Sequence, residues 1–146
     1  MNYLVLLVGF IITFQAYAIE HDETKVSGDR YLGVVGSKTE IDFGSTSCSV
    51  EAKRSENSEF YLELSCDGKD QILWDINHPA PDDFSFDDPK FELLWAGDRD
   101  GDGKIDIEME MSPKYSCRKK VLYLSSLALE GQLVGIYGSP KTTCPD

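Results

Sequence analysis

Apolar and polar residues alternate along two stretches that flank a short polar segment, residues 55–58. The apolar positions of this alternation are Cys48, Val50, Ala52, Phe60, Leu62, Leu64 and Cys66. A repeat of two residues is typical of a β-strand with one buried face. The pattern therefore predicts a β-hairpin that turns at residues 55–58.

The register of this hairpin follows from its apolar positions. Placing Cys48 opposite Cys66 makes the apolar faces of both strands coincide, which is what fixes a register in a half-buried hairpin. One pair opposes this register, because Glu51 then lies opposite Glu63 and like charges repel across a strand pair. The shared apolar face outweighs that pair and predicts a cross-strand disulfide between Cys48 and Cys66.

Short apolar segments separated by turn residues continue along the chain. Those with strand character cover residues 31–36, 39–44, 70–76, 91–97, 104–112, 119–129 and 132–138. Residues 125–131 could instead form a short helical turn, residues 77–89 read as a proline-rich loop, and residues 19–30 are polar and expected to be frayed. The sequence therefore predicts a mainly β fold, a single antiparallel-sheet domain that forms a meander or a small sandwich or barrel.

The first 18 residues carry no Lys, Arg, Asp or Glu and end in Ala16-Tyr17-Ala18. An apolar run followed by this small-residue pattern predicts a signal peptide at residues 1–18. A membrane anchor is the alternative, but the run is short for a membrane span. We therefore expect one secreted or periplasmic β-rich domain at residues 19–146, with no stable membrane anchor after cleavage.

The four cysteines, Cys48, Cys66, Cys117 and Cys144, all follow the signal peptide. An even number of cysteines behind a secretion signal indicates disulfide bonds. Because the hairpin register pairs Cys48 with Cys66, a second disulfide between Cys117 and Cys144 is predicted by subtraction.

The formal net charge is −12 at pH 7, and all of it lies after residue 18. An acidic protein repels nucleic-acid phosphates and anionic membrane surfaces, so we expect no nucleic-acid partner. The charge is compatible with a basic protein partner. Acidic charge also commonly serves only to keep a secreted protein soluble.

A second pattern places four aspartates within nine consecutive positions, at Asp98, Asp100, Asp102 and Asp106. Calcium is a hard cation that takes about six to eight oxygen ligands. At this spacing several carboxylates point to one centre, Gly103 permits a sharp bend, and the carbonyl oxygen of Lys104 can add a ligand. The spacing predicts a Ca²⁺ site at the turn of a β-hairpin, and the alternative is an acidic turn that binds nothing specific.

The same loop differs from an EF-hand and resembles another calcium motif. An EF-hand needs flanking helices and a glutamate where this chain has Met109, in a segment of strand character. Residues 98–106 instead resemble the calcium loops of FG-GAP and VCBS repeats, known from integrin-type propellers. That resemblance implies the ligands Asp98, Asp100, Asp102 and Asp106 and the carbonyl oxygen of Lys104. It covers a single loop, so a propeller fold is not implied.

A longer stretch also resembles known sequences. Residues 93–112, with the later segments LYLSS and GQLVG, resemble an uncharacterised group of small secreted bacterial proteins that share a WAGD-x-D-x-DGK-x-D core. This resemblance supports a common fold unit and implies no activity.

Other candidate residues have weaker chemical support. His21 and His78 lack zinc-ligand spacing, and Ser125-Ser126 lacks the context of a nucleophile elbow. A second acidic cluster could add a calcium ligand, bind a basic partner or simply be solvated; it contains Asp82, Asp83, Asp87 and Asp88.

These observations favour one function and leave two alternatives. We expect a secreted or periplasmic, non-enzymatic module in which Ca²⁺ orders residues 98–106 for stability or partner binding. The first alternative is a cell-envelope inhibitor or immunity-type protein that binds a basic, lysozyme-like hydrolase, suggested by the small size, the secretion signal and the acidic charge. The second is a calcium-assisted hydrolase, which lacks a nucleophile motif.

Overall fold

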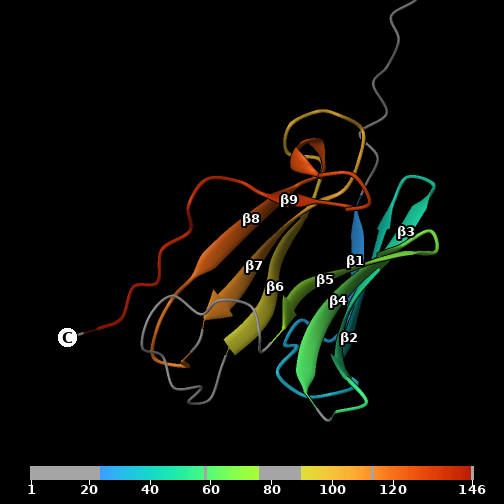
Figure 1. Ribbon diagram of the computed structural model, residues 1–146. Coiled ribbons are helices and arrows are strands. Elements are labelled where there is room, and N and C mark those ends of the chain that lie inside the picture. The colour runs from blue at the N-terminus through green and yellow to red at the C-terminus, as the bar shows by residue number, and fades with distance from the viewer. Residues whose placement is uncertain (1–23, 58, 76–89, 113, 146) are drawn as a thin grey trace, which may run out of the picture.

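The computed structural model describes residues 24–57, 59–75, 90–112 and 114–145. The predicted signal peptide, His21, His78 and the second acidic cluster lie outside these residues. Two antiparallel sheets form the fold, each with its strands paired in chain order (Figure 1). The first sheet consists of β1 (Lys25–Gly28), β2 (Lys38–Phe43), β3 (Thr46–Arg54), β4 (Phe60–Cys66) and β5 (Lys69–Asp75). The second consists of β6 (Lys90–Gly97), β7 (Asp106–Ser112), β8 (Lys120–Leu124) and β9 (Gly135–Ile136).

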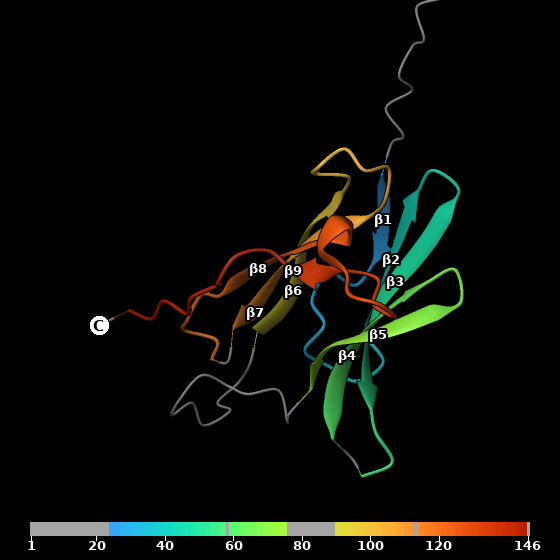
Figure 2. The ribbon, with the colours of Figure 1, turned by 45° about the horizontal axis from the view of Figure 1, so that its top comes forward.

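The two sheets face each other and share one apolar core (Figure 2). Phe91 of β6 joins them, because its ring centroid lies 5.5 Å from that of Phe60 and 5.0 Å from that of Trp74, both in the first sheet. Ile107 and Met109 of β7 are fully buried in the same core. The mainly β prediction is confirmed, and the arrangement is that of two packed sheets rather than a closed barrel.

The predicted register of the β3–β4 hairpin is confirmed, with Cys48 opposite Cys66 and Glu51 opposite Glu63. The repulsion between the two glutamates is relieved by Lys53, which hydrogen-bonds Glu63 and lies 3.8 Å from Glu51. The hydrogen bond that Lys53 donates to Glu63 is the main reason that the pKa of Lys53 is raised above its usual value. A single cation thus compensates for the unfavourable pair.

The structure corrects the expected start of the domain. Lys25–Gly28, expected to be frayed, form β1 and pair with β2. Residues 31–36, expected as a strand, contribute only an isolated bridge between Tyr31 and Glu92. The backbone N–H of the buried Leu32 donates to the carbonyl of Phe91 at 2.8 Å, so this segment connects the two sheets instead. The first segment pairs with the next strand and the second with the distant β6, and in both places this pairing overrides the local pattern.

The C-terminal part of the chain follows the helical alternative. Ser125–Leu127 form a short 3₁₀ helix, η1, directly after β8. The strand expected at residues 132–138 is reduced to the two residues of β9. Among the described residues, no helix is long and apolar enough to cross a membrane.

Both predicted disulfides are present, Cys48–Cys66 and Cys117–Cys144. They join residues 18 and 27 positions apart, and closing loops of this size restricts the unfolded chain enough to add about 3 kcal/mol each. The second disulfide fastens the C-terminal segment to the start of β8, next to the bridge between Arg118 and Thr143.

A buried phenol gives the fold a predicted sensitivity to alkaline pH. Tyr123 of β8 is 4 % exposed, and this burial raises the pKa of its phenol well above the usual value. Above about pH 10 the unfolded chain loses a proton that the folded chain keeps, so stability should fall as pH rises. Urea midpoints measured below and above this pH should decrease with rising pH, and they should decrease less in Tyr123→Phe than in the wild type. The control Tyr115→Phe alters a tyrosine that is 63 % exposed and should follow the wild type; an equal slope in all three proteins would contradict the assignment.

Candidate metal centre

The aspartate loop joins β6 to β7, as the sequence predicts. Gly97, the last residue of β6, pairs with Asp106, the first residue of β7, so residues 98–105 connect the two strands. Gly101 and Gly103 both adopt a φ of 79°, a left-handed conformation that costs a residue with a side chain more than it costs glycine. The two glycines therefore allow the tight path of the loop.

The carboxylate of Asp98 organises the loop from within. It accepts backbone hydrogen bonds from Gly101 at 2.7 Å, from Asp102 at 3.1 Å and from Gly103 at 2.8 Å. Three successive loop residues thus turn their N–H groups toward one carboxylate, which fixes the backbone of the loop around Asp98.

Three of the predicted ligands come together. Asp98, Asp100 and Asp106 each offer one carboxylate oxygen, and these oxygens all lie within 4.8 Å of one another. Two ligands on opposite sides of a calcium ion are about 5 Å apart, because each Ca–O distance is about 2.4 Å. The separation of the three oxygens therefore matches that of oxygens around one calcium ion.

The other two predicted ligands lie differently. Asp102 stands outside this group of three, and its carboxylate accepts hydrogen bonds from the backbone N–H of Lys104 at 2.9 Å and from the hydroxyl of Ser125 at 2.8 Å. The side chain of Lys104 is exposed. Ligation by Asp102 and by the carbonyl oxygen of Lys104 stays a prediction.

Two serines that the sequence did not assign to the site contact it from η1. The backbone N–H and the hydroxyl of Ser125 lie 2.8 and 3.1 Å from one carboxylate oxygen of Asp106, and the hydroxyl of Ser126 donates to Asp100. Asp106 is fully buried, and it also accepts the N–H of Arg99 at 2.7 Å. The order of the strands could have predicted this contact. β8 runs antiparallel to β7, so the end of β8, which η1 follows, lies beside the beginning of β7.

No ion pair with a described Lys or Arg compensates the charge of these four aspartates. The loop arginine, Arg99, points elsewhere: its guanidinium lies 4.6 Å from the ring centroid of Trp95 and 3.6 Å from a carboxylate oxygen of Glu108. Like charges this close repel one another, and hydrogen bonds from backbone and serine groups offset only part of that repulsion.

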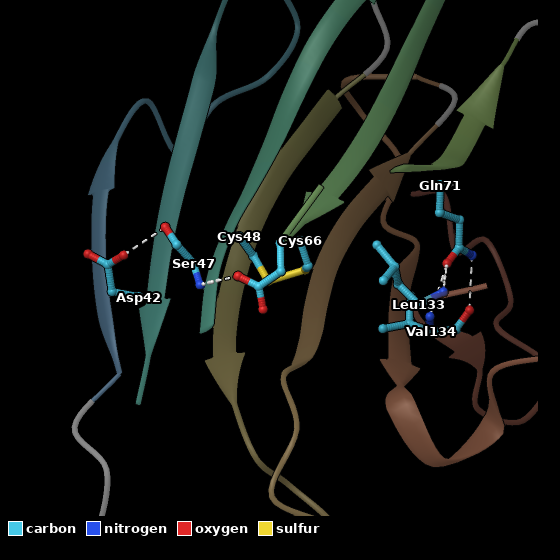
Figure 3. The surroundings of a disulfide bond; sticks show 8 residues. Asp42, Ser47, Cys48, Cys66, Gln71, Leu133 and Val134 are labelled. Atoms are coloured by element: carbon cyan, nitrogen blue, oxygen red, sulfur yellow. Dashed lines mark hydrogen bonds between the residues drawn. A yellow bond between two sulfur atoms is a disulfide. The ribbon is translucent and has the colours of Figure 1, made fainter. Parts of the chain in front are cut away.

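An apolar groove of about 340 Å³ lies beside η1, between β5 and β9. Ile72, Leu127, Leu129 and Ile136 line it, and all four side chains are exposed. Gln71 of β5 connects the two sides of the groove. Its side-chain amide forms hydrogen bonds of 2.7 to 3.0 Å with the backbone of Leu133 and Val134, which precede β9 (Figure 3). Leu127 of the groove wall directly follows Ser125 and Ser126, the two serines that contact the aspartates.

No protein-family model, curated protein or solved structure matches the chain. The resemblance of residues 98–106 to FG-GAP and VCBS loops therefore stays a prediction, and so does the likeness to small secreted bacterial proteins.

Proposed function

We propose that the protein is a secreted or periplasmic, non-enzymatic module that binds one Ca²⁺ ion at the β6–β7 loop. The observation that carries this proposal is the convergence of three carboxylate oxygens within 4.8 Å, one of them from the fully buried Asp106. All the proposed ligand atoms are oxygens, which hard cations such as calcium prefer. The two disulfides are compatible with an oxidising compartment outside the cytoplasm.

The proposed role of the ion is structural. A divalent cation would remove the repulsion among the aspartates, and it would strengthen the connection that Ser125 and Ser126 make from η1 to the loop. Since Leu127 follows these serines, the ion would also fix one wall of the apolar groove. Ordering of the hairpin and support of a partner-binding surface are then consequences of the same site.

The test is thermal unfolding of the oxidised chain from Ile19 in excess EDTA and in millimolar calcium. A free calcium concentration about a hundred times the dissociation constant should stabilise the fold by about 2.7 kcal/mol. We expect the midpoint of the wild type to rise by several degrees, and that of Asp98→Ala/Asp102→Ala not to change.

A matched control removes two carboxylates elsewhere. Asp29→Ala/Asp70→Ala makes the same change in net charge at exposed positions outside the loop and should keep the calcium response. If calcium shifts the midpoint of the loop variant as much as that of the control, or leaves the wild type unchanged, the proposed function is wrong.

A further inference from the structure

Apart from Arg99 and Lys104 in the aspartate loop, the cations of the second sheet and its connections lie at the end opposite that loop. β6 and β8 begin there, with Lys90 and Lys120, and β7 ends there with Ser112. Six of the 14 Lys and Arg residues belong to this region, hereafter the basic end: Lys90, Lys114, Arg118, Lys119, Lys120 and Lys141. Because a strand rises about 3.4 Å per residue, the seven-residue β7 separates the basic end from the loop by about 20 Å.

Several contacts show that these cations are neighbours, although their positions span residues 90 to 141. Lys90 pairs with Ser112, and its ammonium lies 6.0 Å from the ring centroid of Tyr115. Lys120 lies opposite Glu110 on β7. The bridge between Arg118 and Thr143 and the disulfide Cys117–Cys144 then bring the segment that contains Lys141 to the same place.

Few of these charges are compensated. Glu92 lies 3.4 Å from Lys90, and Glu110, which is 2 % exposed, lies 3.9 Å from Arg118. In the described part of the chain, the side chains of Lys114, Lys120 and Lys141 form no ion pair. Among the described residues, these six cations form ion pairs with only two carboxylates, on a chain whose net charge is −12.

We propose that the basic end binds an anionic membrane surface through the phosphates of its lipid headgroups. Five of the six cations are lysines, whose ammonium groups act as point charges and do not require the fixed geometry of a single bound phosphate. They project from three separate chain segments, which suits a broad array of headgroups. Tyr115, 63 % exposed among them, has the apolar ring and polar hydroxyl that favour the headgroup layer.

The overall acidity does not prevent this contact. At physiological ionic strength charges are screened over about 8 Å, so the loop aspartates, about 20 Å away, contribute little at the bound surface. The same separation would direct the aspartate loop away from the membrane. This inference is independent of calcium, because none of the aspartates of the loop belongs to the basic end.

The test is co-sedimentation of the oxidised chain from Ile19 with vesicles of phosphatidylcholine alone or mixed with phosphatidylglycerol. All described strands lie between Lys25 and Ile136, so this chain keeps the whole described fold without the apolar N-terminal run. We expect binding only to the mixed vesicles. Each lysine near an anionic surface strengthens binding about fivefold, so Lys114→Gln/Lys120→Gln/Lys141→Gln should weaken it about 100-fold.

The control Lys25→Gln/Lys38→Gln/Lys69→Gln makes the same change in net charge on the first sheet and should bind like the wild type. Equal loss in both variants, or equal binding to neutral vesicles, would overturn the proposal. So would binding to soluble polyphosphate without binding to vesicles, which would identify a free phosphate polymer as the ligand. Binding that appears only after Asp82, Asp83, Asp87 and Asp88 are all changed to Asn would also overturn it for the native protein.

Discussion

An Asp106→Ala protein should lose its response to calcium together with stability that does not depend on calcium. Asp106 is fully buried and accepts the backbone N–H groups of Arg99 at 2.7 Å and of Ser125 at 2.8 Å. Leaving buried donors unpaired costs about 1–3 kcal/mol. Loss of an ion present at about a hundred times its dissociation constant adds about 2.7 kcal/mol. The expected loss in calcium is therefore about 4–6 kcal/mol.

Urea unfolding in EDTA and in calcium separates the two parts of this loss. The N–H groups of Arg99 and Ser125 bond to different carboxylate oxygens, so Asp106→Asn keeps an acceptor for only one of them and removes the charge. It should retain more stability in EDTA than Asp106→Ala and still lose the calcium response. Asp70→Ala, at an exposed position of β5, should behave like the wild type. An Asp106→Ala protein that calcium still stabilises by the wild-type amount would contradict both the site and the role assigned to this residue.

Local pattern was sufficient to predict the β3–β4 hairpin and the aspartate loop. In the hairpin a shift of one residue would expose every apolar side chain, so alternation alone determined the pairing of Cys48 with Cys66. In the loop, the spacing of the aspartates and glycines within nine residues sufficed to bring Asp98, Asp100 and Asp106 together. Both features depend on neighbours in sequence, which is why the sequence could predict them.

The features that escaped prediction depend on contacts that the local order of apolar and polar residues does not encode. Residues 25–28 contain a single apolar residue, Val26, and form a strand by pairing with β2. Ser125 reaches Asp106, 19 positions earlier, because β8 returns along β7. Neither contact has a signature in the local order of polar and apolar residues.

The net charge likewise gave an incomplete picture. The sum of −12 predicted repulsion from anionic surfaces. It did not show that Lys90, Lys120 and Lys141 meet at one end of the second sheet, because these positions are brought together only by strand pairing and the second disulfide. A binding partner responds to the net charge of the surface within about one Debye length, and that local charge depends on the fold.

The largest effect on the fold itself should come from Phe91→Ala. Phe91 is 1 % exposed and contacts both Phe60 and Trp74 across the two sheets. Truncating a buried phenylalanine removes its apolar area from the core and leaves a cavity, which costs about 3–5 kcal/mol. Among the described residues, both ring contacts between the two sheets involve Phe91.

Tryptophan fluorescence and circular dichroism during urea unfolding would measure this loss, because Trp74 reports on the contact itself. Ile72→Ala removes a side chain of the first sheet that is 51 % exposed and should cost less than about 1 kcal/mol. Phe91 lies at the beginning of β6 and the aspartate loop follows its end, so the calcium response should survive in any Phe91→Ala protein that remains folded. Equal losses in the two variants would mean that the sheets are held together elsewhere, and loss of the calcium response would mean that the loop depends on the packing of the whole core.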